Sequence, residues 1–281
     1  MTAATTLTAE DHLRVAQYVQ STAGIQLPEH KRNLIEARLR KRLRATGQSS
    51  FTAYLDLALS DADNEAEREW LLDAITTNKT EFFREPEHFR FLSQYLQQAL
   101  SSGHEAGVSR PLSVWSSACS TGEEPYTLAM VLSELKRDKP EFNFQIHATD
   151  IAPSVLSVAR QAIYPVARIA PVDEPLRHRY LLKSRDPARQ QVRIVPELRE
   201  RVSFSRFNLV DGDYPRTPEY DVIFCRNVMI YFSNDDRQNI IERLRTSLRV
   251  GGLLFIGHSE SIGHQRNGFE TLYPTVYRRI S

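Results

Sequence analysis

Cysteine is scarce in this chain of 281 residues, which contains only Cys119 and Cys225. Each of the two falls at the end of an expected strand, an arrangement that suits a reducing compartment better than a disulfide framework. The eight histidines are scattered, without the paired Cys and His spacing of a zinc site. We therefore expect a cytoplasmic protein that has no metal.

Long hydrophobic runs are also missing. No apolar stretch approaches the roughly 18 residues that a membrane-spanning helix needs. Residues 1–7 have neither the basic nor the apolar segment of a secretion signal. The 41% of hydrophobic residues is nevertheless enough for a full core, and the length allows one large domain or two modest ones. These features predict a soluble, folded chain.

Glycine is sparse after the first expected strand, which ends near Ser117. The turn that follows contains only Gly122, whereas a dinucleotide-binding fingerprint requires three glycines, so nicotinamide and flavin sites are disfavoured. The turn is otherwise built of small residues that let the backbone approach a ligand, and Pro125 suits the first turn of a helix. The residues of this turn are compatible both with a ligand site and with an ordinary strand–turn–helix unit.

Helical periodicity predicts an all-helical domain over residues 1–77. Its second helix, residues 30–44, carries seven basic residues and one acidic residue. Of these, Arg38, Lys41 and Arg42 lie away from the apolar stripe of the helix. The ordinary explanation is that these side chains form a solvated charged face. The more specific hypothesis is that they form a docking site for an anionic partner.

Residues 78–90 break this periodicity and are expected to form a hinge between two domains. Their mixture of polar residues with Phe82 and Phe83 fits a ligand-facing hinge as well as a packed corner. From residue 91 to 281, strands and helices alternate, which predicts an α/β domain with a parallel sheet and helices on both faces. The expected strands are 112–117, 144–149, 202–208, 222–225, 253–258 and 275–279.

Two details of this second domain are predicted as well. Residues 164–202 are rich in proline and include a short β-like segment, so they are expected to form a small inserted β-subdomain. The alternative is a plain connecting loop without a binding role. Gly251 and Gly252 are expected to end the preceding helix and to lead directly into the next strand.

Ligands of open α/β sheets bind beyond the carboxyl ends of the strands. The candidates on this rim are Cys119–Glu124, Asp150–Ile151, Asn208–Leu209, and Arg226–Asn227 with Tyr231. They offer an acid for ribose hydroxyls, a turn of small residues, polar groups for an adenine edge and an arginine for a carboxylate. This set suits S-adenosylmethionine, a ligand without phosphate, for which no glycine-rich cradle is needed.

The sequence resembles the CheR-type chemoreceptor glutamate O-methyltransferases over nearly its whole length. The segments that carry the resemblance, in this order, are Asn78–Glu85, Ser120–Tyr126, Thr149–Ile151, Phe224–Phe232 and Gly257–Glu260. It implies a Rossmann-like methyltransferase sheet with an N-terminal all-helical domain and a small inserted β-subdomain. It also implies that S-adenosylmethionine is the methyl donor and S-adenosylhomocysteine the product.

The resemblance further implies which residues hold the cofactor. These are Asn78, Thr80 and Arg84 of the hinge, Glu123 or Glu124, Asp150, Asn208, Leu209, Arg226 and Asn227, and the choice between the adjacent glutamates is left open. Arg84 is predicted to orient a carboxylate, either the cofactor's or the substrate's, and Tyr231 to supply the wall or a polar contact beside the transferring methyl group. The alternatives are an ion pair of Arg84 with Glu81 or Glu85, and simple packing of Tyr231.

The implied reaction transfers a methyl group to the γ-carboxylate of glutamates in the cytoplasmic helices of chemoreceptors. A glutamate with a pKa of about 4.3 is already ionised at neutral pH, so no general base is needed, and alignment and desolvation must supply the rate. The basic helix would face the receptor through Arg38, Lys41 and Arg42. Nothing in the sequence demands more than a monomer.

Some family members also bind an aromatic-containing pentapeptide at the receptor's C-terminus through the β-subdomain. The corresponding turn, Lys183–Arg189, carries no glycine here, unlike the glycine-bearing turn of the peptide-binding members. The competing interpretations are a nucleic-acid methyltransferase and a non-catalytic binding module. Against the first, Cys225–Val228 lacks a proline-aromatic clamp for a flipped base; against the second, the cofactor rim is intact.

Overall fold

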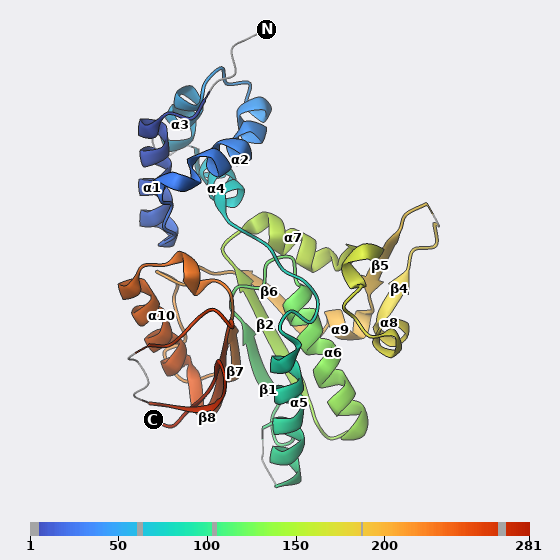
Figure 1. Cartoon of the computed structure of the whole chain (residues 1–281). Helices are drawn as coiled ribbons and strands as arrows, with labels where there is room; N and C mark the ends of the chain where they lie inside the picture. The colour runs from blue at the N-terminus through green and yellow to red at the C-terminus, as the bar shows by residue number, and fades with distance from the viewer. Residues whose placement is uncertain (1–5, 61–63, 103–105, 187, 264–267) are drawn as a thin grey trace.

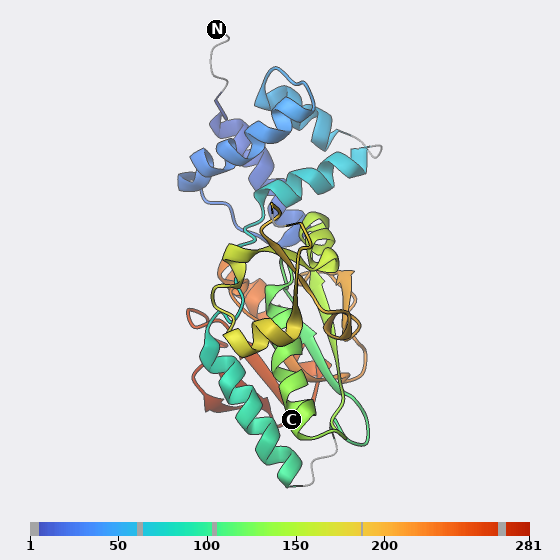
Figure 2. The ribbon, with the colours of Figure 1, turned by 90° about the vertical axis from the view of Figure 1, so that its right-hand side faces the viewer.

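The computed structural model describes residues 6–60, 64–102, 106–186, 188–263 and 268–281. A helical unit lies at one end of an α/β unit, and a small β-unit lies at its side (Figures 1 and 2). Residues 1–5, at the start of the expected helical domain, and Pro187, in the turn over Lys183–Arg189, lie outside the described ranges.

The N-terminal unit is helical, as predicted. Its elements are α1 (Ala9–Ala23), η1 (Glu29–Lys31), α2 (Arg32–Ala45), α3 (Phe51–Leu59) and α4 (Glu65–Ile75). A capping box between Thr8 and Asp11 begins α1, and Gly24, with φ of 69°, ends it. A Cβ at Gly24 would lie 2.5 Å from Val210 Cγ2, so glycine also lets this unit approach the α/β unit closely.

A seven-stranded sheet forms the centre of the α/β unit, in the order β6-β2-β1-β7-β8-β10-β9. The strands are β1 (Leu112–Ser116), β2 (Phe144–Asp150), β6 (Val202–Arg206), β7 (Tyr220–Cys225), β8 (Leu248–Ile256), β9 (Phe269–Tyr273) and β10 (Val276–Arg279). The first five in the order are parallel, which confirms the predicted class. The expectation of a parallel sheet is wrong at the other edge, because β10 pairs antiparallel with both β8 and β9.

Helices cover both faces of this sheet. They are α5 (Pro86–Ser101), α6 (Glu123–Asp138), α7 (Pro153–Gln161) and α10 (Asn234–Ser247). Alternate residues of β1 point to opposite faces, so Val114 packs in the core with α5, α6 and α7 while Trp115 packs in the core with α10. Helices thus bury both faces of the sheet, and a pocket lies at the carboxyl ends of its parallel strands.

The expectation for Gly251 and Gly252 is wrong. Helix α10 ends at Ser247 and β8 begins at Leu248, so both glycines lie inside the strand. The register between β7 and β8 shifts at this point, and a Cβ at Gly252 would lie 2.9 Å from the carbonyl oxygen of Asp221. The glycines therefore serve a bulge and a close backbone approach instead of a helix end.

The insertion between α7 and β6 forms the expected small β-unit. Its elements are β3 (Ile163–Pro165), η3 (Val166–Ile169), α8 (Glu174–Tyr180), β4 (Leu181–Lys183), β5 (Gln191–Ile194) and α9 (Pro196–Arg199). The three strands are antiparallel in the order β3-β5-β4. Tyr164 and Val192 belong to the same core as α6, so the insertion is packed onto the main unit and does not hang free.

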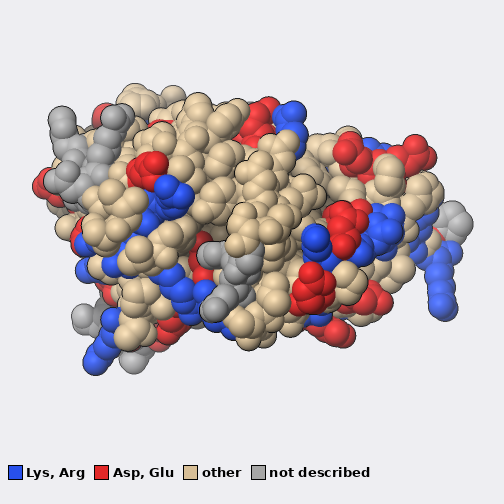
Figure 3. All heavy atoms as spheres, turned by 90° about the horizontal axis from the view of Figure 1, so that it is seen from below, with Lys and Arg blue, Asp and Glu red and all other residues tan. Residues whose placement is uncertain are grey.

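No helix within the described ranges is long and apolar enough to cross a membrane. On the face opposite the N-terminal helices, positive and negative side chains are interspersed around a broad uncharged band (Figure 3). The charges drawn on that face do not gather into one cationic surface of the kind that a nucleic-acid backbone would require.

Candidate functional site

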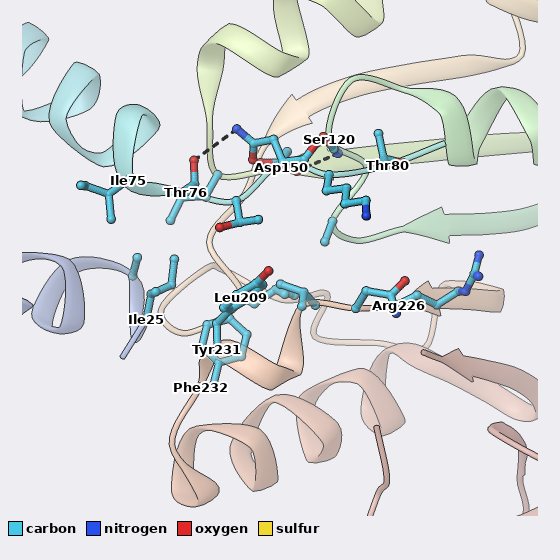
Figure 4. A pocket seen from close by; sticks show the side chains of 18 of the residues that line it. Ile25, Ile75, Thr76, Thr80, Ser120, Asp150, Leu209, Arg226, Tyr231 and Phe232 are labelled. Atoms are coloured by element: carbon cyan, nitrogen blue, oxygen red, sulfur yellow. Dashed lines mark hydrogen bonds between the residues drawn. The ribbon is translucent and has the colours of Figure 1, made fainter. Parts of the chain in front are cut away.

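A pocket lies where β1, β2 and β7 end, between the N-terminal helices and the α/β unit. Asp150, Ser120 and Thr80 lie along one wall in Figure 4, and Leu209 and Tyr231 lie across from them. The predicted residues that line this pocket are Arg38, Asn78, Thr80, Arg84, Glu124, Asp150, Asn208, Leu209, Arg226, Asn227 and Tyr231. Glu123, Lys41 and Arg42 are not among the lining residues.

The turn between β1 and α6, residues 117–122, is held in a strained conformation. Ser120 has a φ of 48°, a region that residues other than glycine rarely adopt. Its backbone N–H donates to Asp150 Oδ2 at 2.8 Å, and its hydroxyl donates to the carbonyl oxygen of Asn78 at 2.9 Å. The strain is therefore sustained by the neighbouring strand and by the hinge.

Asp150 ends β2 with its carboxylate fixed by backbone donors. Besides Ser120, the N–H of Ala152 donates to Oδ1 at 3.0 Å. Burial raises the pKa of Asp150, and these backbone hydrogen bonds oppose the rise. The side chain is pre-organised at the pocket wall, where the resemblance places a ribose partner.

A buried arginine joins three distant segments. The Arg226 side chain is 1% exposed, and its guanidinium pairs with Glu85 Oε2 at 2.8 Å and with Glu124 Oε2 at 3.1 Å. The rings of Phe89 and Phe224 lie 5.5 and 5.7 Å from its Cζ atom. Arg226 therefore connects the hinge, the start of α6 and the end of β7.

The pKa values of the two carboxylates in this cluster are shifted in opposite directions. Burial alone would raise the pKa of Glu85, but hydrogen bonds from Arg226 and Asn227 lower it to about 2. Burial raises the pKa of Glu124 despite the opposing effect of Arg226. Ser116 also donates its hydroxyl hydrogen to Glu124 Oε1 at 2.8 Å, which orients the carboxylate beside the pocket.

Glu260 holds the chain beyond β7, a role that the sequence did not reveal. Its carboxylate accepts hydrogen bonds from the backbone N–H groups of Gly257 at 2.6 Å, Met229 at 2.8 Å and Asn227 at 2.9 Å. Asn227 has a φ of 57°, so the bonds support another strained residue. The only indication of this role in the sequence is that Glu260 belongs to Gly257–Glu260, one of the segments that carry the resemblance.

Glu85, His88 and His258 form a cluster whose potential ligand atoms lie within 4.8 Å of one another. The hydroxyl of Thr275 donates to the carbonyl oxygen of Pro274 and lies 2.8 Å from His88 Nε2, which makes Nε2 the protonated ring nitrogen. Burial and the charge of Arg226 lower the pKa of His88 to about 4. Because Arg226 already donates to Glu85 Oε2, we assign this cluster to packing around the arginine.

The two residues predicted to take part in transfer both face the pocket. Arg84 donates to the carbonyl oxygen of Lys79 at 2.9 Å, and within the described ranges it has no ion pair with Glu81 or Glu85. Tyr231 ends the 3₁₀ helix η4 (Met229–Tyr231), and its ring lies 5.7 Å from Lys31 Nζ. The pairing that would have made Arg84 a surface residue is thus not formed.

The predicted receptor-facing side chains of α2 have different surroundings. Arg38 donates to the carbonyl oxygen of Thr76 at 3.1 Å and to the hydroxyl of Thr77 at 3.1 Å, so it fixes the two residues that lead into the hinge. Arg42 donates from Nε to Oε1 of Glu67 at 3.0 Å. Lys41 is exposed. Contact with a receptor remains a prediction for all three.

The segment between α1 and η1 supplies a pocket wall that the sequence did not indicate. Ile25, Gln26 and Leu27 line the pocket. The N–H of Gln26 donates to the carbonyl oxygen of Tyr231 at 2.8 Å, and the amide of Asn208 donates to the carbonyl oxygen of Thr22 at 2.7 Å. The helical unit thereby closes the site from above.

Residues 78–278 match the family model described as CheR methyltransferase, SAM binding domain, and residues 10–76 match the one described as CheR methyltransferase, all-alpha domain. The chain is 39% identical to chemotaxis protein methyltransferase 2 of Pseudomonas aeruginosa over 96% of this chain and 93% of the relative. It is 38% identical to the chemotaxis protein methyltransferase of Escherichia coli over 94% of this chain and 88% of the relative. A relative from Borreliella burgdorferi is 38% identical over 97% and 95%, respectively.

Replacing Arg226 by alanine should leave two buried carboxylates without their cation. We expect Arg226→Ala to lower the free energy of unfolding by about 3–5 kcal/mol. Urea denaturation measures the change. Arg90→Ala is the matched control, because Arg90 is 67% exposed and forms a surface pair with Glu87, so it should cost less than about 1 kcal/mol. Equal losses for the two variants would contradict the assigned role.

His88 should make the protein sensitive to acid. Its pKa is about 4 in the folded state against an ordinary 6.5, so its contribution is complete above pH 6.5 and is lost as the pH falls from 6.5 towards 4. We expect His88→Gln to remove a loss of stability on the order of 2 kcal/mol between about pH 7 and pH 5. Denaturation curves at several pH values test this, with His178→Gln, 72% exposed, as the control that keeps the wild-type slope.

Proposed function

The chain belongs to the CheR methyltransferase family, and on that premise we propose that it methylates glutamate γ-carboxylates in the cytoplasmic helices of chemoreceptors. S-adenosylmethionine is the donor and S-adenosylhomocysteine the product. The observation that carries the proposal is the pocket at the ends of β1, β2 and β7, which joins Asp150, Glu124 and the hinge around one ligand-sized space.

We propose that Glu124, and not Glu123, is the glutamate that faces the cofactor. Glu124 and Asp150 both line the pocket, whereas Glu123 does not and instead forms an ion pair with Arg168 of the insertion at 2.9 Å. Asn78, Thr80, Asn208, Leu209 and Asn227 also line the pocket, which supports their assignment to the cofactor. Because both guanidinium ends of Arg226 are engaged, we assign Arg226 to holding Glu85 and Glu124 in place.

The proposed chemistry is an in-line displacement. A carboxylate oxygen of the substrate glutamate attacks the methyl carbon, the carbon–sulfur bond breaks, and its electron pair returns to sulfur, so a sulfonium and a carboxylate become a thioether and an ester. No proton is transferred. Arg84 would orient a carboxylate and Tyr231 would supply the wall and a polar contact beside the methyl group, and their positions in the lining of one pocket support both roles.

The receptor, in this proposal, approaches from the α2 side of the pocket. Lys31, Leu34 and Arg38 line the pocket from the helical unit, so a substrate helix that meets α2 can reach the methyl group. Of the three predicted basic contacts, Lys41 has its charge exposed. We also propose that the enzyme acts as a cytoplasmic monomer, which equilibrium sedimentation and cell fractionation can test.

A receptor C-terminal peptide could add a strand to the small sheet, because β3 and β4 are its edges. The turn between β4 and β5 lacks the glycine of peptide-binding members, so we expect weak or no capture of such a peptide by this chain. Titration calorimetry with receptor tail peptides measures it directly.

The activity itself is tested with labelled S-adenosylmethionine and either receptor-bearing membranes or RNA. Label that is released from protein by mild base indicates a carboxyl methyl ester. Label on RNA would favour the nucleic-acid alternative, and no transfer would favour a binding module.

Two substitutions test the transfer machinery. We expect Arg84→Ala to lower kcat/KM about 100-fold through loss of alignment, and Tyr231→Phe to lower it about tenfold through loss of one polar contact. Arg278→Ala, in β10 beside the far edge strand β9, should leave turnover unchanged. The roles of Arg84 and Tyr231 are wrong if their variants fold and turn over like the wild type.

A charge reversal tests the receptor-facing helix. Lys41→Glu should lower kcat/KM for receptor several-fold at low ionic strength, and the difference should shrink in roughly 1 M salt, where the Debye length is about 3 Å. Lys139→Glu at the end of α6 makes the same change in net charge away from the pocket and should have little effect. Steady-state rates over a salt series give the comparison, and a salt-independent Lys41→Glu defect would contradict electrostatic docking.

A further inference from the structure

Glu123 presents a buried charge that the cofactor site does not use. Only 1% of the residue is exposed, and it begins α6 directly after the β1–α6 turn. The hydroxyl of Thr121 donates to Oε2 at 2.6 Å, and the guanidinium of Arg168 pairs with Oε1 at 2.9 Å. A buried carboxylate needs such a partner, since an unpaired one would carry a large desolvation cost.

The partner of this charge comes from the insertion. Arg168 lies in η3, and the Nη1 atom that pairs with Glu123 also lies 3.4 Å from the carbonyl oxygen of Thr80, to which it donates. Thr80 lines the pocket from the hinge. One guanidinium thus touches three segments: the insertion, the start of α6 and the hinge.

Tyr164 of the insertion supports the same turn. Its hydroxyl donates to the carbonyl oxygen of Thr121 at 2.8 Å, and its ring packs edge-on against Phe82 of the hinge at 5.0 Å. Gly122, with φ of 95°, is so close that a Cβ there would lie 2.9 Å from the Tyr164 hydroxyl oxygen. The insertion therefore backs the turn on the side away from the pocket, while Ser120 lines the pocket on the other side.

We propose that Arg168 is a positioning residue that couples the inserted β-subdomain to the cofactor site through Glu123. The inference rests on the proposed function, because it assigns S-adenosylmethionine to the pocket behind the turn. Arg168 does not touch the cofactor. It holds the turn and the hinge at one spacing, so its loss weakens binding of the donor and of the transition state alike, which raises KM for the donor and changes kcat little.

A double-mutant cycle with S-adenosylhomocysteine calorimetry tests the coupling. Arg168→Ala should weaken binding about tenfold, and Arg168→Lys should restore part of the loss because it keeps the charge. In a Glu123→Gln background, where no buried charge needs a partner, Arg168→Ala should change the affinity less than about twofold. The control is Arg179→Ala, which removes a different link between the insertion and α6, the pair of Arg179 with Glu134 at 2.7 Å, and should leave the affinity unchanged.

Equal weakening by Arg168→Ala and Arg179→Ala would overturn the proposal, as would effects of Arg168→Ala and Glu123→Gln that simply add. Wild-type affinity in Arg168→Ala would also overturn it. If Arg168→Ala does not fold, the cycle is completed with Arg168→Lys, for which the same non-additivity is required. A wild-type protein that binds no S-adenosylhomocysteine would instead contradict the proposed function, so the two failures are distinguishable.

Discussion

The pairing of Arg226 with Glu85 and Glu124 is the interaction on which the site depends. A guanidinium that is 1% exposed is stable only where both of its ends are neutralised, so the hinge and α6 must meet at the end of β7. Arg226 also holds two pocket residues directly, because its guanidinium donates to the Glu124 carboxylate at 3.1 Å and to the carbonyl oxygen of Arg84 at 2.5 Å. These charge pairs therefore matter more for fixing the positions of the hinge and α6 than for stabilising the fold.

Backbone strain is concentrated around the same pocket. Phe83, Glu85, Ser120 and Asn227 all have positive φ, and all lie on the hinge, the β1–α6 turn or the segment after β7. Each such residue costs free energy that the surrounding contacts must offset. The carboxylates of Asp150 and Glu260 provide much of this compensation by accepting backbone hydrogen bonds. Rigid acceptors thus hold the loops in the conformation that shapes the pocket.

Local patterns predicted much of this arrangement. The strand ends, Asp150 and the small-residue turn could be placed from the sequence because parallel strands direct their carboxyl ends to one edge. The edge strand β9 and the bulge at Gly251 and Gly252 could not, because a short apolar segment and a glycine pair each fit several local structures. The N-terminal wall formed by Ile25 to Leu27 was missed for another reason: it depends on how two separate cores pack together.

The sequence by itself determined the alternation of helices and strands that gives the fold class, the residues at the sheet rim and, through the five shared segments, the family. Only the tertiary structure decided which partner each charged side chain has: Glu124 faces the pocket while Glu123 faces the insertion, and Arg38 binds the backbone just before the hinge while Arg42 pairs with Glu67. The physical reason is that a charged side chain selects its partner through space, at a distance of a few ångströms. Adjacent residues on a helix point in different directions, so sequence position alone cannot identify that partner.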